Sequence, residues 1–259
     1  MKTRFGFAAL AAAVSLFASH ISVAQVTEDS MGKVIPVELF VCSYVEGKGR
    51  EDLDPVVAQW TKFMDDRKIN DYAAWLLTPY YYGAGQDFDL IWMGASKDGK
   101  AMGNTTHLWV TEGGEVAAAF DEVMHCAVHV GMSSAMYKSP PQNRTPGSSI
   151  LSMSDCTMNE GTRYSDVRSA EIKWAAYREE NGSKSGTWHW FPTFGGGDQD
   201  FDYKIMTSHE NFKELGADWE KAANGGGREV SESVFGDLDE CDDERVYVAR
   251  SIRAVQLRK

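Results

Sequence analysis

The sequence lacks the short motifs that mark several enzyme classes. It has no Gly-x-Ser-x-Gly elbow, no Walker loop, no dinucleotide-binding Gly-x-Gly-x-x-Gly and no His-Glu-x-x-His pair. The glycine triplets 195–197 and 225–227 do not open a helix after a strand, so we interpret them as turns rather than phosphate cradles. Catalysis therefore has no evident motif, and we lean towards a protein that is not an enzyme.

Basic residues are also scarce. The chain has 26 Lys and Arg against 38 Asp and Glu, a formal net charge of −12. Nucleic acids and anionic lipids attract basic surfaces, so we expect neither as a partner. After residue 24 no stretch approaches the ~18 apolar residues of a membrane-spanning helix. We therefore expect no membrane span.

The first 24 residues have the pattern of an export signal. Lys2 and Arg4 precede an apolar run over residues 5–18, and Ser22-Val23-Ala24 forms a small-x-small cleavage site. We predict a signal peptide at 1–24 and a periplasmic or secreted mature protein, in which disulfide bonds can persist.

The rest of the chain contains an internal duplication. The stretch GAGQDFDLIWM (83–93) is echoed by GGGDQDFDYKIM (195–206), and the similarity continues on both sides. The aligned positions include aromatic, proline and cysteine residues: Trp75 and Trp188, Pro79 and Pro192, Phe88 and Phe201, Cys42 and Cys156. Two copies of a unit of roughly 100 residues indicate two similar small domains, because a solenoid needs at least about three repeats.

We place repeat 1 at 33–137 and repeat 2 at 148–259, joined by a proline-rich linker at 138–147. In both repeats the residue pattern predicts strand, helix, two strands as a hairpin, helix and strand. The expected ranges in repeat 1 are 35–44, a helix capped by Asp54 and running to Asn70, 72–82, 87–95, 116–123 and 128–137. In repeat 2 they are 149–155, 167–177, 187–194, 200–207, 211–223 and 245–255.

This element order is that of a ferredoxin-like βαββαβ domain, which is an α+β fold with one uncovered sheet face. Two such units in one chain can pack sheet to sheet. The chain thereby resembles the dimeric α/β-barrel superfamily in its tandem form, as an intramolecular barrel pair. The resemblance implies that haem, an aromatic polyketide or another small apolar ligand could lie between sheet and helices, although some such barrels only assemble.

Aromatic residues concentrate on the predicted hairpins. Strand alternation sends Trp188 and Trp190 to the same face. We propose seven candidate ligand-binding residues: Trp75, Tyr81, Trp188, Trp190, Phe191, Tyr203 and His209. His209 is included because it follows the third strand of repeat 2, where the resemblance to haem-binding barrels allows an axial ligand. The alternative is that these aromatic residues form ordinary core and that His209 lies on the surface.

Metal sites find little support in the sequence. Asp198, Asp200 and Asp202 have the spacing that opens a calcium loop, but Tyr203 stands where that loop requires glycine and His209 where it requires glutamate. We expect no metal and no cofactor, with haem as the open alternative.

Four cysteines in an exported chain can pair in three ways. Each repeat has one cysteine near the end of its first strand and one just before its last strand, and these strands are antiparallel neighbours in a ferredoxin-like sheet. We therefore predict the disulfides Cys42–Cys126 and Cys156–Cys241, with four free thiols as the alternative.

The function that we infer from the sequence is binding of a small apolar or aromatic molecule or of a protein partner. Two alternatives stay open. One is a barrel-type enzyme, haem-dependent or cofactor-free, similar to monooxygenases or dismutases; the other is a structural or assembly module.

Overall fold

The computed structural model describes residues 33–141, 144, 147–197, 199–255 and 257, so the predicted signal peptide lies outside the described residues. Repeat 1 contains β1 (Ile35–Tyr44), α1 (Arg50–Asp66), β2 (Tyr72–Tyr81), β3 (Leu90–Ser96), α2 (Gly99–Glu112), α3 (Gly114–Asp121) and β4 (Met124–Lys138). Repeat 2 contains β5 (Ser148–Met158), α4 (Tyr164–Glu180), β6 (Gly186–Phe194), β7 (Tyr203–His209), α5 (Phe212–Asn224), α6 (Gly227–Phe235), β8 (Asp239–Cys241) and β9 (Arg245–Arg253).

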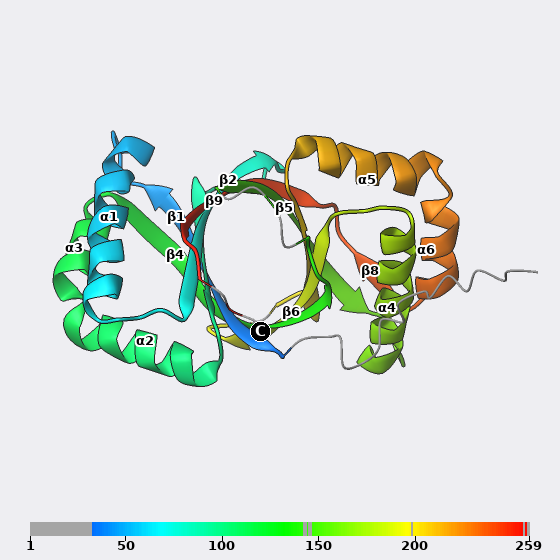
Figure 1. The fold of residues 1–259 in the computed structure, drawn as a ribbon, viewed down its shortest axis with the longest axis horizontal. Coiled ribbons are helices and arrows are strands. Elements are labelled where there is room, and N and C mark those ends of the chain that lie inside the picture. The colour runs from blue at the N-terminus through cyan, green and yellow to red at the C-terminus, as the bar shows by residue number, and fades with distance from the viewer. Residues whose placement is uncertain (1–32, 142–143, 145–146, 198, 256, 258–259) are drawn as a thin grey trace, which may run out of the picture.

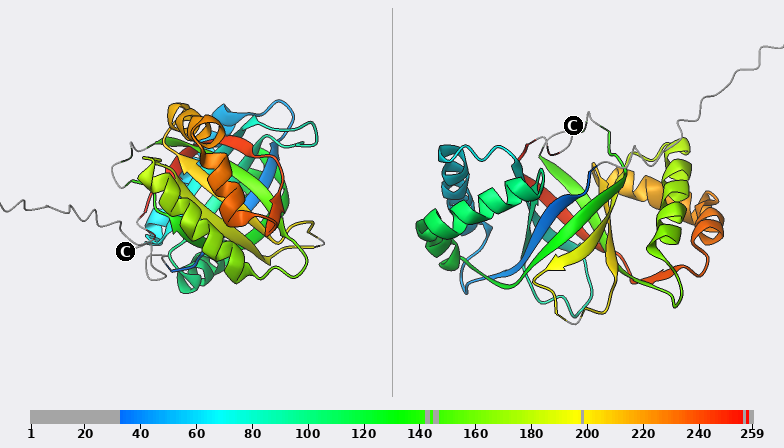
Figure 2. Two further views of the ribbon diagram at one scale, coloured as in Figure 1. Left: turned by 90° about the vertical axis from the view of Figure 1, so that its right-hand side faces the viewer. Right: turned by 90° about the horizontal axis from the view of Figure 1, so that it is seen from below.

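The sheet of each repeat has the ferredoxin-like order, β4-β1-β3-β2 in repeat 1 and β9-β5-β7-β6 in repeat 2. In addition β2 pairs with β9 and β4 pairs with β6, so the two sheets close into one eight-stranded barrel. Helices α1–α3 cover one side of the barrel and α4–α6 the other (Figures 1 and 2). The predicted fold class is confirmed; the hydrogen bonds along both shared edges are an addition that the element order did not predict. The domain limits stay a prediction.

The repeats differ most at their last strand. In repeat 1, β4 runs unbroken beside β1 and accommodates one register shift opposite Val41 and Cys42. In repeat 2 the same edge is divided, because β8 pairs with Cys156–Met158 and β9 pairs with 148–153 of β5. Together β8 and β9 are the counterpart of β4.

Three hydrophobic cores follow from the alternation of side chains along the strands. The inner core fills the barrel and draws on both repeats, with Leu39, Met93, Met153 and Tyr247 among its members. An outer core under α1 and α3 includes Trp60, Trp92 and Phe120. A smaller outer core under α4 includes Val167 and Tyr203.

Two helix boundaries differ from those expected. Helix α1 begins at Arg50, one turn before the predicted start, because the Asp52 carboxylate accepts a hydrogen bond from the Gly49 N–H at 3.0 Å and caps the helix there. Pro55 consequently lies inside the helix. Between β3 and β4 the sequence predicted one helix, at 116–123. The structure has two helices there, α2 and α3, which meet at Gly113.

Both predicted disulfides are confirmed. Cys42 is bonded to Cys126 and Cys156 to Cys241, in each case between residues that are directly opposite in the sheet. All four cysteines are therefore used, and the alternative of free thiols is wrong.

Candidate functional site

The structure divides the sequence-predicted aromatic residues between the two sides of the barrel wall. Trp75, Trp188 and Trp190 pack in the inner core, so Trp188 and Trp190 do share a face. Phe191 and Tyr203 pack with α4 in the small outer core, with their ring centroids 5.9 Å apart. Tyr81 is 57% exposed. None of these residues lines the three cavities described below, and their role in ligand binding stays a prediction.

His209 ends β7 and is buried rather than on the surface. Burial lowers the pKa of its imidazole to about 4, an effect that Asp218 opposes and Arg178 and Arg144 reinforce. Its Nδ1 lies 3.6 Å from Asp218 Oδ2 and has no hydrogen-bond partner within the described residues. His209 is therefore neutral at pH 7 and lines none of the three cavities.

The most aromatic cavity lies in repeat 1, between the outer face of the sheet and helices α2 and α3. We call it the helix–sheet cavity. Its volume is about 490 Å³, within the usual range of small-molecule sites. Its walls are ring systems and apolar side chains: Phe40, Trp60, Met64, Trp92, Trp109, Val110, Phe120 and Met124. Flat rings packed around such a space suit a flat apolar ligand.

A chain of hydrogen-bonded polar groups runs along the wall of this cavity. His129 Nε2 lies 3.0 Å from Glu38 Oε2, and the Tyr72 hydroxyl donates to Glu38 Oε1 at 2.6 Å. Trp92 Nε1 in turn donates to the Tyr72 hydroxyl at 3.2 Å. The His129 ring is stacked on Phe40, with centroids 3.6 Å apart. Burial, followed by the Glu38 charge, raises the pKa of Tyr72 well above its ordinary value, so Tyr72 stays protonated and donates.

Gly94 makes this polar chain possible. It lies opposite Glu38 in the β1–β3 ladder, and a Cβ at this position would meet the Tyr72 hydroxyl oxygen at 1.8 Å. The phenol of Tyr72 thus reaches Glu38 only because residue 94 has no side chain. A second cavity of about 490 Å³ continues past Gly94 and shares Glu38, Tyr72 and His129 with the first.

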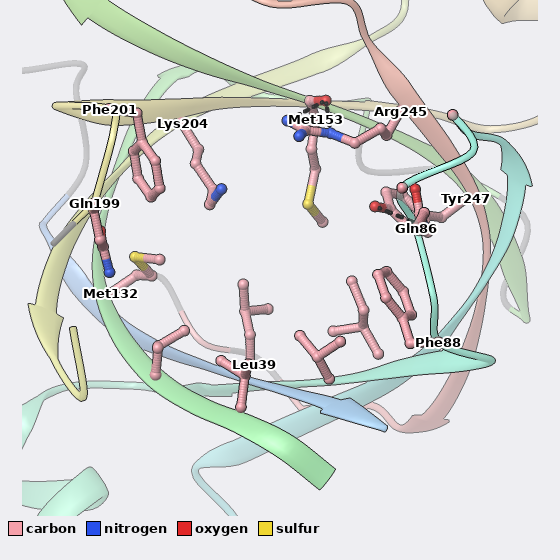
Figure 3. Close-up of a pocket in the computed structure, with 16 residues that line it drawn as sticks. Leu39, Gln86, Phe88, Met132, Met153, Gln199, Phe201, Lys204, Arg245 and Tyr247 are labelled. Carbon is pink, nitrogen blue, oxygen red and sulfur yellow. Dashed lines mark hydrogen bonds between the residues drawn. The ribbon is translucent and has the colours of Figure 1, made fainter. Parts of the chain in front are cut away.

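The barrel interior holds a third cavity, of about 470 Å³, which we call the lumen cavity. Figure 3 shows side chains from both repeats pointing into it. Leu39 and Met132 come from repeat 1, and Lys204, Arg245 and Tyr247 come from repeat 2. The lumen cavity is therefore a space that neither repeat could form alone.

Repeat 2 buries a polar cluster that the sequence analysis missed. Glu171 of α4 is 1% exposed and its Oε2 lies 3.5 Å from Nε2 of His189, which is completely buried. His189 Nδ1 is 3.1 Å from the hydroxyl of Tyr164, which also contacts the hydroxyl of Tyr137. The sequence does carry a trace of this cluster, because Glu171 falls four residues after Val167 on the buried face of α4.

Neither a calcium site nor another metal site is found where the chain can be described. Asp198 lies outside the described residues, and no three His, Cys, Asp or Glu side chains of the described part converge on one point. Within the same residues, no helix combines the length and the hydrophobicity needed to cross a bilayer.

Comparison with known proteins shows what this architecture is similar to. No family model matches the sequence, and no curated protein matches it either. Among solved structures, a candidate monooxygenase from Lactobacillus acidophilus superposes with a TM-score of 0.52 at 7% identity, covering 86% of this chain and 96% of its own. A haem-binding protein from Thermus thermophilus superposes with a TM-score of 0.51 at 8% identity, covering 84% and 90%.

A third structure is the chlorite dismutase of Candidatus Nitrospira defluvii in complex with imidazole, with a TM-score of 0.49, 8% identity and coverage of 83% and 90%. The first two matches show that the fold is shared over most of both chains.

The expectation that the protein has no cofactor is corrected by these comparisons. A protein with the same fold over most of its length is described as haem-binding, so the fold accommodates a cofactor. The reason for the error is physical. The expectation rested on missing sequence motifs, whereas a haem site can consist of apolar walls and one axial side chain that leave no motif.

Proposed function

We propose that the protein is a barrel-type haem protein that holds the flat macrocycle in the helix–sheet cavity of repeat 1. The observation that carries this proposal is the composition of the cavity wall. Three tryptophans and two phenylalanines surround about 490 Å³, and one histidine, His129, is among the described lining residues. The similarity to a haem-binding protein supports haem as the bound group.

The donors of this cavity fit the needs of a haem iron. Histidines that bind metals usually have their second ring nitrogen hydrogen-bonded to a carboxylate, and His129 has this arrangement with Glu38 at 3.0 Å. Because Nε2 is engaged, Nδ1 is the nitrogen that remains for iron. When bound, haem would supply redox chemistry at its iron. Trp60, Trp92 and Trp109 would enclose the ring, and Glu38 would orient the imidazole by accepting a hydrogen bond from its Nε2–H.

The polar chain favours a second candidate, a cofactor-free enzyme acting on a flat aromatic substrate in the same cavity. His129 would take a proton from the bound substrate, and Glu38 would orient the imidazole and stabilise its charged form. Tyr72 and Trp92 would hold Glu38 in place through their hydrogen bonds. The two candidates share the cavity and differ in whether iron is needed.

Titration with hemin and with iron-free protoporphyrin IX tests the proposal. We expect both to quench tryptophan fluorescence, and hemin to give a shifted Soret band that is lost in His129→Ala. The matched control is His125→Ala, an exposed histidine on the same strand that does not line the cavity. His209→Ala should also leave the spectrum unchanged.

Each outcome decides between the candidates. Binding of both compounds with no Soret shift that depends on His129 would favour the cofactor-free enzyme. Failure of both compounds to bind, or a Soret shift that depends on His209 instead, would overturn the placement in repeat 1.

A further inference from the structure

Both copies of the repeated loop motif contribute to the wall of the lumen cavity. Gln86 and Phe88 of repeat 1, and Gln199 and Phe201 of repeat 2, all line it. Figure 3 shows the two phenylalanines entering the space from opposite walls. The repeated motif therefore lines this cavity in both repeats.

The aspartate after each phenylalanine fixes the loop in position. Asp89 N–H donates to Cys42 O at 3.0 Å, and the Asp89 carboxylate accepts from Tyr44 N–H at 2.7 Å. Asp202 makes the same pair of bonds, to Cys156 O at 2.9 Å and from Met158 N–H at 2.7 Å. Both loops are thereby tied to the strand that carries the disulfide, and both phenylalanines are held at the cavity.

The cavity walls differ between the repeats at equivalent positions. Sheet registers establish the equivalence: Val41 pairs with Ile91 in repeat 1 as Asp155 pairs with Lys204 in repeat 2. Leu39 pairs with Val130 as Met153 pairs with Arg245, and Val37 pairs with Met132 as Leu151 pairs with Tyr247. Aliphatic residues and one methionine in repeat 1 are thus replaced in repeat 2 by Asp155, Lys204, Arg245 and Tyr247.

The cationic side chains of repeat 2 line the cavity, whereas the carboxylates that pair with them do not. Lys204 and Arg245 line the cavity, whereas their partners Asp155 and Asp242 do not. Arg245 Nη2 lies 3.3 Å from Asp155 Oδ1, and Lys204 is bonded to the same carboxylate. Burial lowers the pKa of Lys204, while Asp155 opposes this effect. An ion cluster in a barrel core is commonly no more stabilising than apolar side chains, so stability alone does not account for it.

We propose that the lumen cavity binds a medium-chain alkyl carboxylate. The carboxylate would lie against Lys204, Arg245 and the Tyr247 hydroxyl, groups that form charge-assisted hydrogen bonds with an anion. The alkyl chain would lie against the aliphatic wall of repeat 1 and the adaptable methionines Met132 and Met153. This site is separate from the helix–sheet cavity and goes beyond the function proposed for it.

Calorimetric titration with decanoate, and with decanol as the uncharged probe of equal chain length, tests this inference. The decisive variant is Asp155→Val with Lys204→Ile, which gives repeat 2 the residues that repeat 1 has at these positions and leaves the net charge unchanged. We expect this double variant to bind decanoate roughly tenfold or more weakly, the effect of losing one hydrogen bond to a charged group. Decanol binding should be unchanged.

Lys184→Ile is the matched control, because it removes an ion pair on the surface, with Glu214, far from the lumen lining. It should bind decanoate like the wild type, as should His129→Ala, which separates this site from the helix–sheet cavity. If the double variant does not fold, Tyr247→Phe should weaken decanoate binding by a smaller factor. The inference is overturned if the wild type does not bind decanoate, if it binds decanol equally well, or if a folded lumen variant keeps full affinity.

Discussion

Repeat 1 leaves a cavity between its sheet and its helices, whereas repeat 2 buries a polar cluster of Tyr164, Tyr203, His189 and Glu171 under α4. The repeats also differ inside the barrel. Repeat 1 supplies an aliphatic wall to the lumen cavity, and repeat 2 supplies charged groups. The element order is the same in both repeats apart from the division of the last strand into β8 and β9, whereas the side chains that line the lumen cavity differ. Under our two proposals, repeat 1 alone forms the aromatic site and both repeats together form the lumen site.

The largest effect that we predict tests whether the repeats are stabilised alike. Replacing Cys42 and Cys126 with alanine opens a loop with a sequence separation of 84, and replacing Cys156 and Cys241 opens one of 85. The chain-entropy treatment gives about 4.5 kcal/mol for either loop. Urea denaturation of the two double variants should show similar losses in the free energy of unfolding. A loss in one variant that is less than half that in the other would show that the repeats are not equivalent in this respect.

A smaller effect concerns a feature of repeat 2 alone. The pKa of His209 is lowered to about 4 in the folded protein, against about 6.5 in the unfolded chain. Between these values the unfolded state binds more protons, so stability is lost as the pH falls from 6.5 towards 4, by an amount on the order of 3 kcal/mol. Its counterpart in repeat 1 is Ser96, which does not titrate.

Measuring the free energy of unfolding of His209→Gln from pH 7 to pH 4.5 checks this expectation. The variant should lose less stability over this range than the wild type, after allowance for any change at pH 7. The matched control is His107→Gln, which changes an exposed histidine on α2 and should keep the wild-type slope. If the free energy of unfolding changes equally with pH in His209→Gln and in the wild type, protonation of His209 does not destabilise the fold.

Much of the fold could be predicted because duplication is visible without any structure. The four cysteines align as two pairs between the repeats. In the ferredoxin-like order the first and last strands are neighbours, so only one of the three possible pairings joins cysteines on neighbouring strands of the same repeat. The closure of the barrel could not be predicted in the same way. Pairing of β2 with β9 and of β4 with β6 depends on which edges meet, and the pattern within a strand does not encode its partner.

The candidate sites were harder to predict for a related reason. Glu38 lies in the largely apolar strand β1, and His129 is one of two histidines on β4. The two residues are separated by 91 positions, and only the β1–β4 register brings them together. The aromatic clusters were visible, but alternation along a strand shows that two faces exist and not which of them is left hollow. In the structure Trp190 packs in the inner core, whereas Trp92 and Trp109 line the helix–sheet cavity.

The smallest effect that we predict tests the part of the comparison in which the repeats agree. Asp89 and Asp202 each accept a hydrogen bond from a backbone N–H at 2.7 Å. Each holds a loop whose phenylalanine lines the lumen cavity. Both side chains are exposed, so Asp89→Ala and Asp202→Ala should each lower the free energy of unfolding by about 1 kcal/mol, the usual net value of one such hydrogen bond. The controls are Asp87→Ala and Asp200→Ala, which change the other aspartate of the same motif and should have almost no effect. Urea denaturation of the four variants measures all of these values. Equal losses at Asp87 and Asp89 would mean that the motif acts through its charge rather than through the hydrogen bonds that Asp89 and Asp202 share.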